Sequence, residues 1–237
     1  MGNRFFFPKI KVPSILNKIA KYSSAQSKTA YLTFDDGPSS NTPAVLDILK
    51  EHNVVATFFV TGNDTQSGHS MYKRISAEGH QLGNHTYSHN YSSIYKSVKS
   101  FTEDFLRLER LLQSVTGVRT MIIRYPGGSN NTVSHRYGGT GLMPKIISEM
   151  SNRGYIHFDW NVDAADATNA IENKKLIVSN VLTQANEKNN VIVLLHDGEA
   201  QKATATALPE IIKGLRSQGF HFKVLTNNSL RIQFIKA

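Results

Sequence analysis

Short apolar runs alternate with amphipathic stretches along most of the chain. Runs rich in β-branched and aromatic residues predict buried strands. They are residues 31–34, 54–60, 121–123, 155–158, 191–195 and 220–225. Stretches with apolar residues every three or four positions predict helices. They are residues 43–49, 94–115, 143–152, 174–187 and 207–216. This alternation predicts an α/β fold with a parallel sheet, either open or closed into a barrel.

The first 28 residues differ from the rest. They hold six of the chain's 27 basic residues and none of its 18 acidic ones, and Pro8 and Pro13 interrupt them. We therefore expect a basic tail and linker over residues 1–28 and one domain over residues 29–237. The tail could be simply solvated, or it could associate with an anionic membrane or wall surface. No basic stripe follows in the domain, so we expect no nucleic-acid partner.

Composition narrows the chemistry further. The chain has 237 residues, 40% of them hydrophobic and 19% charged, which is ordinary for a globular protein. It contains no cysteine, so any metal must be held by His, Asp or Glu. No apolar segment approaches the ~20 residues that span a bilayer, and no signal peptide is visible. Either the protein stays inside the cell or the chain begins after a removed segment.

Polar motifs follow several of the predicted strands. They are Asp35-Asp36 within Thr-Phe-Asp-Asp-Gly-Pro, His85-Thr-Tyr-Ser-His89 after the short strand 81–83, Arg124-Tyr-Pro-Gly-Gly, Asp163, and His196-Asp197. Because the carboxyl ends of barrel strands share one face, these segments are expected to converge.

Each motif alone has an ordinary structural explanation. Asp35-Asp36 could form a turn, Asp163 could cap a helix, and His196 could be a buried structural histidine. His85 and His89 are four residues apart, so on a helical turn they would face one way and could share a metal. The motifs are persuasive jointly, because each stands at a strand end.

Together these segments resemble the five motifs of the polysaccharide deacetylases with a NodB-type domain, the fourth carbohydrate esterase family. The resemblance covers about residues 28–230. It implies a single-domain, distorted (β/α) barrel. It also implies that Asp36, His85 and His89 hold a divalent metal, zinc in the first place and cobalt as an alternative.

The resemblance also assigns the proton-transfer groups. Asp35 is similar to the family's general base, and Arg124 to the arginine that orients it. We expect the Arg124 charge to keep Asp35 ionised. His196 is similar to the general acid, and Asp163 to its orienting partner.

Two further residues match the family's substrate contacts. The backbone N–H of Tyr125 is the expected oxyanion donor, and Leu194 is similar to the leucine that lines the acetyl pocket. One departure stands out, because the family's Asp-x-x-Asp-Trp reads Asp163-Ala-Ala-Asp166-Ala167 here. The only tryptophan, Trp160, is expected to be a core residue, so we expect an altered substrate preference.

The function implied is metal-dependent removal of N-acetyl groups from N-acetylglucosamine in a glycan. The glycan would be peptidoglycan or a chitin-like oligomer, in an extracellular or cell-surface setting. Two alternatives remain open: a hydrolase of a small cyclic amide or imide on the same fold, and a non-catalytic glycan-binding protein. Release of acetate from a glycan would separate the first function from both.

Overall fold

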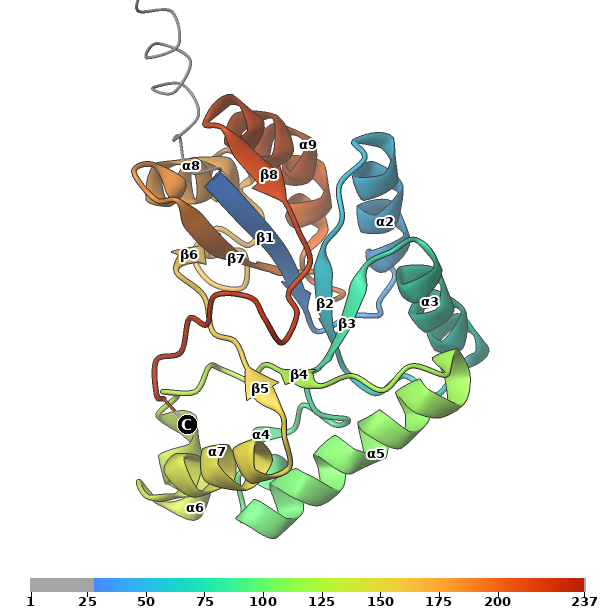
Figure 1. Ribbon diagram of the computed structural model, residues 1–237, viewed down its shortest axis with the longest axis vertical. Helices are drawn as coiled ribbons and strands as arrows, with labels where there is room; N and C mark the ends of the chain where they lie inside the picture. Colours follow the sequence, from blue (N-terminus) through green and yellow to red (C-terminus); the bar gives the residue numbers. More distant parts are fainter. Residues whose placement is uncertain (1–27, 237) are drawn as a thin grey trace, which may run out of the picture.

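A parallel sheet of eight strands organises the chain (Figure 1). The computed structural model describes residues 28–236. The strands are β1 (Lys28–Asp35), β2 (Thr57–Val60), β3 (Gln81–Asn84), β4 (Ile122–Ile123), β5 (Ile156–His157), β6 (Val162–Asp163), β7 (Asn190–His196) and β8 (Phe220–Phe222). Their order is β5-β4-β3-β2-β1-β7-β6, with β8 beside the start of β1. This arrangement confirms the predicted α/β barrel fold.

Strand β1 shows how the sheet positions the site. Leu32 and Phe34 pack in the large cluster that joins the sheet to its surrounding helices. Side chains alternate along a strand, so Tyr31, Thr33 and Asp35 point to the opposite face. Tyr31 lies there in a separate cluster with inward-facing residues of other strands. Asp35 is thus directed into the barrel at the carboxyl end of its strand.

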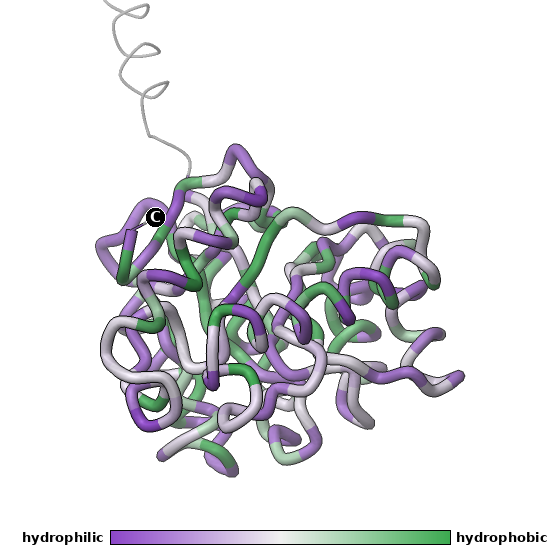
Figure 2. Tube along the Cα trace, turned by 90° about the horizontal axis from the view of Figure 1, so that it is seen from below, coloured by the Kyte–Doolittle hydropathy of each residue, from purple (hydrophilic) through white to green (hydrophobic). Residues whose placement is uncertain are grey.

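Helices pack around the outside of the sheet. They are α2 (Thr42–Glu51), α3 (Gln66–Ala77), α4 (Tyr91–Ile94), α5 (Val98–Thr116), α6 (Val133–Gly138), α7 (Leu142–Asn152), α8 (Lys174–Ala185) and α9 (Lys202–Ser217). Figure 2 shows the most hydrophobic segments inside and the polar ones mainly on outer loops and helices. A second cluster of buried residues joins α5 and α7 to β4. These two helices therefore cover the part of the sheet around β4.

The barrel is left open between its edge strands β5 and β6, and the segment that follows β8 covers this opening. The backbone N–H of Asp159 donates to Ile232 O at 2.8 Å. His157 Nε2 lies 2.9 Å from Ile235 O, and Gln233 donates to the backbone of His157. This crossing segment explains why the barrel is distorted, because its last gap is filled by irregular chain (Figure 1).

Some elements differ from the sequence-based predictions. Helix α3 was not predicted, because only Gly68, Tyr72 and Ile75 of its twelve residues are buried. The single helix predicted over 94–115 is divided into α4 and α5, since Ser97 is extended and caps α5 by accepting the Ser100 N–H. The short helix α6 also lies outside the stretches for which the apolar pattern predicted helices.

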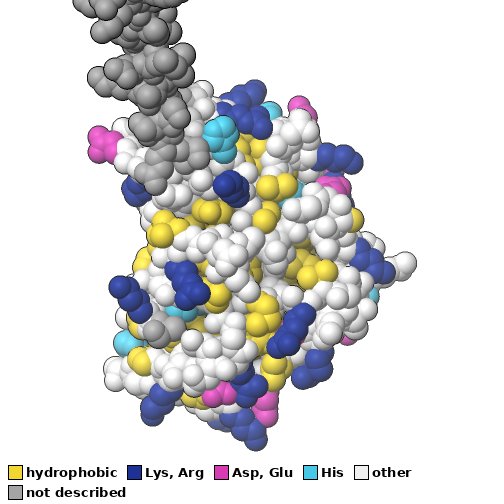
Figure 3. Space-filling model, in the orientation of Figure 1, with side chains coloured by type: hydrophobic (Ala, Val, Ile, Leu, Met, Phe, Trp, Pro, Cys, Tyr) yellow, Lys and Arg dark blue, Asp and Glu magenta, His cyan; other side chains and the backbone are white. Residues whose placement is uncertain are grey.

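The surface of the described part is mixed in charge. Lysine and arginine side chains are scattered over the face shown in Figure 3. The predicted basic tail falls almost wholly on residues 1–27, outside the described part. Within residues 28–236, none of the helices combines the length and apolar character needed to cross a membrane.

Candidate active site

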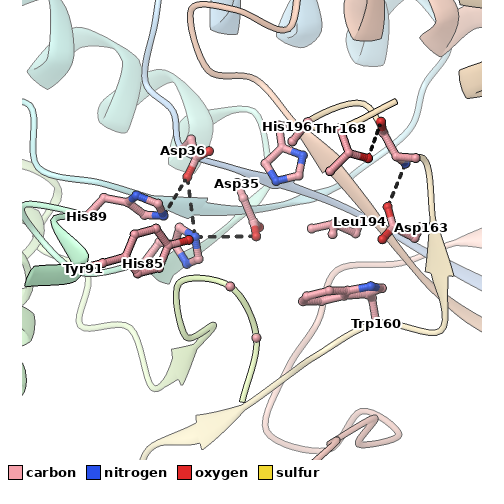
Figure 4. A pocket seen from close by; sticks show the side chains of 14 residues that line it. Asp35, Asp36, His85, His89, Tyr91, Trp160, Asp163, Thr168, Leu194 and His196 are labelled. Carbon is pink, nitrogen blue, oxygen red and sulfur yellow. Dashed lines mark hydrogen bonds and ion pairs between the residues drawn. The ribbon is translucent and has the colours of Figure 1, made fainter. Parts of the chain in front are cut away.

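The carboxyl ends of the strands converge on a pocket of about 310 Å³ (Figure 4). Asp35 ends β1 and is aligned directly with His196, which ends β7. Asp36 follows β1, and the loop after β3 brings His85 and His89 to the same place. Residues 160 positions apart in sequence therefore face one another, as expected from the strand ends.

Asp36, His85 and His89 form a cluster suited to a metal ion. Asp36 Oδ1 lies 3.5 Å from His85 Nε2 and 3.3 Å from His89 Nε2. Two ligands bound at 2.0–2.2 Å to one tetrahedral ion are separated by about 3.3–3.6 Å. Asp36 Oδ1 is also buried without a hydrogen-bond partner within residues 28–236. The donor atoms and their spacing thus fit a divalent ion such as zinc.

His85 is prepared to act as a neutral ligand. Its Nδ1–H donates to the backbone carbonyl of Arg124 at 2.7 Å, which leaves the lone pair of Nε2 facing the cluster. Burial, reinforced by the neighbouring His89, lowers the pKa of His85 to about 3. The ring therefore stays unprotonated at neutral pH, as metal binding requires.

The two histidines do not share a helical turn, but the loop that carries them still brings both rings to the cluster. The loop between them has left-handed backbone at Thr86 (φ +70°) and at His89 (φ +48°). Asp36 is also left-handed, at φ +76°. Such conformations cost about 1–3 kcal/mol each and persist only where the surroundings enforce them. Here they turn three side chains toward a common point.

Asp35 is held by a fully buried arginine. Arg124 Nη1 donates to Asp35 Oδ1 at 2.9 Å and to Thr33 Oγ1 at 2.7 Å. Its other N–H groups donate to the carbonyls of Phe158 and Asp159. Burial raises the pKa of Asp35, and Arg124 opposes this rise without cancelling it. Arg124 thus orients Asp35, and its charge favours the ionised carboxylate as expected, although it offsets only part of the effect of burial on the pKa.

The partner of His196 is Asp166, and the prediction of Asp163 needs correction. The Nδ1–H of His196 donates to Asp166 Oδ1 at 2.8 Å, and its backbone N–H donates to Oδ2 at 2.8 Å. Thr204 also donates to Asp166 Oδ2, so this buried carboxylate is well satisfied. Asp163 instead accepts the Ala165 N–H at 2.7 Å. It ends β6 opposite Leu194 of β7, two residues before His196, and the carboxylate that reaches His196 comes three residues later, from Asp166.

The pKa of His196 reflects this pairing. Burial alone would lower it, but the hydrogen bond to Asp166 and the charges of Asp166 and Asp35 raise it to about 9. His196 is thus protonated at neutral pH, with its Nδ1 occupied by Asp166. This is the state that a general acid needs.

The remaining walls of the pocket are less polar. Leu194 and Trp160 line it together with Ala165, Ala167 and Thr168 (Figure 4). Trp160 is therefore a wall of the pocket and not only a core residue, although its ring also meets Phe234 edge-on at 5.0 Å. A side chain at Gly128 would come within 3.0 Å of the indole, so the glycine leaves room for it.

Tyr125 differs from the other predicted site residues in the position of its side chain. Its side chain is buried in the cluster between α5, α7 and β4, and does not line the pocket. Only its backbone can therefore serve the site. Within the described residues, the N–H of Tyr125 has no hydrogen-bond partner, which is consistent with an available donor.

Comparisons with known proteins agree with this arrangement. The family model described as "Polysaccharide deacetylase" matches residues 22–140. A peptidoglycan-N-acetylglucosamine deacetylase of Bacillus cereus is 33% identical over 233 residues, covering 94% of this chain and 77% of its own length. The chain belongs to the polysaccharide deacetylase family. It is therefore a deacetylase, a hydrolase that acts on amide bonds.

Other relatives of this deacetylase support the fold and the family. The catalytic domain of a peptidoglycan N-acetylglucosamine deacetylase from Eubacterium rectale superimposes with a TM-score of 0.83 at 34% identity. That similarity covers 91% of this chain and 98% of that domain. A peptidoglycan-N-acetylmuramic acid deacetylase, PdaA of Bacillus subtilis, is 32% identical and covers 84% of this chain and 71% of its own length.

Proposed function

We propose that this deacetylase removes N-acetyl groups from N-acetylglucosamine residues of peptidoglycan, with a divalent metal held by Asp36, His85 and His89. The observation that carries the proposal is the combination of an ion-sized donor cluster with Asp35 on one side and a protonated His196 on the other. Amide hydrolysis needs a base for water and an acid for the departing amine. The site contains a candidate for each.

The roles of the chain's own groups follow from their positions. A bound divalent ion supplies Lewis-acid polarisation of the amide carbonyl and a more acidic water. Asp35, oriented by Arg124, accepts the proton of the attacking water. The N–H of Tyr125 can donate to the oxygen on which negative charge develops. His196, held by Asp166, then gives a proton to the sugar nitrogen as its bond to the acyl carbon breaks. Acetate and a free amino sugar are the products.

The choice of peptidoglycan is supported by the named relatives. Two of them act on the N-acetylglucosamine of peptidoglycan, and PdaA acts on N-acetylmuramic acid. N-acetylmuramic acid and chitin-like oligomers are therefore the substrates to compare with N-acetylglucosamine. A substrate in the cell wall also places the enzyme, in our proposal, outside the cell or at its surface.

The experiment measures acetate released from purified peptidoglycan and from chitooligosaccharides by the zinc-supplied protein. We expect release from peptidoglycan, loss after treatment with a chelator, and recovery when zinc or cobalt is returned. Mass spectrometry of digested peptidoglycan identifies which sugar has lost its acetyl group. Tight glycan binding without acetate release, with metal present, would contradict the proposal and favour a binding protein.

The N-terminal segment enters this proposal separately. We propose that residues 29–237 form the catalytic domain and that the basic residues 1–28 increase association with an anionic wall or membrane surface. Removal of residues 1–27, which leaves β1 intact, should reduce sedimentation with purified wall or with anionic vesicles. It should leave acetate release from a soluble oligosaccharide unchanged. Equal sedimentation of the two proteins would disprove this role for the tail.

A further inference from the structure

Helix α5 holds the loop that carries both histidines of the metal cluster. Asp104, on this helix, accepts the backbone N–H groups of two successive loop residues through one carboxylate oxygen. Oδ1 lies 2.6 Å from Tyr87 N and 3.0 Å from Ser88 N. These two residues lie between His85 and His89, so the contact is made at the centre of the motif.

The loop needs partners from outside because its backbone forms no regular hydrogen-bond ladder. The segment 85–90 forms neither helix nor strand, and left-handed residues stand at Thr86 and His89. Backbone N–H groups in such a segment must be satisfied from outside or left without partners. A carboxylate acceptor forms a charge-assisted hydrogen bond, which is roughly twice as strong as a neutral one.

The same helix makes a second contact, one residue further on. The carbonyl of Phe105 accepts from Asn84 Nδ2 at 3.1 Å. Asn84 Oδ1 in turn accepts the N–H of Thr86 at 2.9 Å. Phe101 and Phe105 are buried in the core, so the helix that presents Asp104 is itself firmly anchored.

Contacts of Tyr87 link helix α5 to the segment that carries Asp36, the third residue of the cluster. Arg107 of α5 covers the ring of Tyr87, with the guanidinium carbon 3.6 Å from the ring centre. The carbonyl of Tyr87 accepts from Gly62 N at 2.9 Å. The neighbouring Thr61 donates through its hydroxyl to the carbonyl of Asp36 at 3.2 Å. The loops that carry all three ligands are thus connected to α5.

We propose that Asp104 is a positioning residue that sets the affinity of the metal site by fixing the loop between His85 and His89. This inference rests on the proposed metal site. Asp104 is not among the residues that line the pocket, and it contacts the loop through the backbone N–H groups of Tyr87 and Ser88. Its contribution is to remove the freedom of the histidines before the ion binds.

The test compares Asp104→Ala and Asp104→Asn with the control Glu103→Ala. Glu103 is exposed on the same helix, and its ion pair with Lys99 is a long one, at 3.8 Å. Zinc affinity is measured by competition with a chromophoric chelator, and thermal unfolding of the metal-free protein reports folding. Visible absorption of the cobalt-substituted protein reports the geometry around the ion.

Asp104→Ala should weaken zinc binding about 10–100-fold, the usual cost of removing a group that orients metal ligands. Its cobalt spectrum should change, whereas Glu103→Ala should match the wild type in both measurements. Asp104→Asn keeps an oxygen acceptor but loses the negative charge, so its zinc affinity should lie between that of Asp104→Ala and that of the wild type. If Asp104→Ala does not fold, Asp104→Asn decides the question.

The outcomes are distinguishable. Wild-type zinc affinity and cobalt spectrum in a folded Asp104 variant would overturn the inference, even if its melting temperature is lower. A wild-type protein that binds no zinc would instead contradict the proposed metal site.

Discussion

One side of the pocket is formed by Asp36, His85 and His89, which come from two loops. These loops contain left-handed residues, and side chains of neighbouring elements hydrogen-bond to the backbone of the loop that carries the histidines. On the other side, Trp160, Ala167 and Thr168 come from the connection between β5 and α8, which contains only the two-residue strand β6. Ala167 and Thr168 are exposed there, whereas His85 is almost wholly buried.

This difference separates two tasks. The side with the proposed metal ligands has its donor groups held in place by the surrounding protein, which is what electrostatic catalysis and metal binding need. The opposite side presents Ala167 and Thr168 to solvent beside the ring of Trp160, and such a wall selects substrates by shape. Changes on the first side should therefore act on the rate of chemistry, and changes on the second should act on substrate choice.

The largest effect is expected at Asp35. Asp35→Asn removes the base but keeps the side chain's size, so kcat should fall about 10²–10⁴-fold, the usual range for a positioned base. Zinc content, measured by elemental analysis, should remain near wild type. Asp36→Asn is the matched comparison, because the adjacent change should lose zinc as well as activity. Near-normal turnover by Asp35→Asn would contradict its role as the base.

A smaller effect on activity is expected from Asp166→Asn, which removes the negative charge of the hydrogen-bond partner of His196. In the proposed mechanism the protonated form of His196 is the active one, so activity should fall as pH rises through the His196 pKa of about 9. Without the Asp166 charge, burial lowers this pKa, and the alkaline limb of the pH profile should move to lower pH. The kcat at neutral pH should fall about 100-fold, the lower end for general acid catalysis.

Asp163→Asn provides the control for this change within the same motif. Asp163 accepts one backbone N–H from Ala165, and an asparagine oxygen can accept it too. Its pH profile should therefore follow the wild type. Equal shifts of the alkaline limb in the two variants would contradict the assignment of Asp166 as the partner of His196.

The fold was largely predictable because its strands are buried on both faces, which leaves uninterrupted apolar runs such as 191–195 in β7. Helix α3 was not predictable in this way, since few of its residues are buried. The break between α4 and α5 was hidden because Ile94 and Val98 keep a helical spacing across it. The capping role of Ser97 decided this boundary, and apolar periodicity does not detect it.

Some residues of the candidate site could likewise be predicted from the sequence, and others could not. Asp35, Asp36 and the two histidines stand in contiguous motifs at or just after strand ends, so strand topology brings these motifs to one edge of the sheet. Asp163 ends the two-residue strand β6 and Asp166 follows it in an irregular segment, where sequence spacing does not reveal which carboxylate turns inward. Burial of Asp166 and its contact with His196 depend on how that segment folds over β7.

The smallest effect is expected at Ala167, where a substitution tests most directly whether the two sides of the pocket act separately. Ala167→Trp places an indole on the exposed wall and should narrow the space beside Leu194 and Trp160. We expect the ratio of kcat/KM for N-propionyl over N-acetyl oligosaccharides to fall about tenfold, the lower end of what one methylene contributes to discrimination in a pocket. Zinc affinity should not change, because the proposed metal ligands lie on the opposite side of the pocket. Asn169→Trp adds the same ring outside the pocket lining and should leave the ratio unaltered. A loss of zinc in Ala167→Trp, or equal losses on both substrates, would show that the two sides do not act separately.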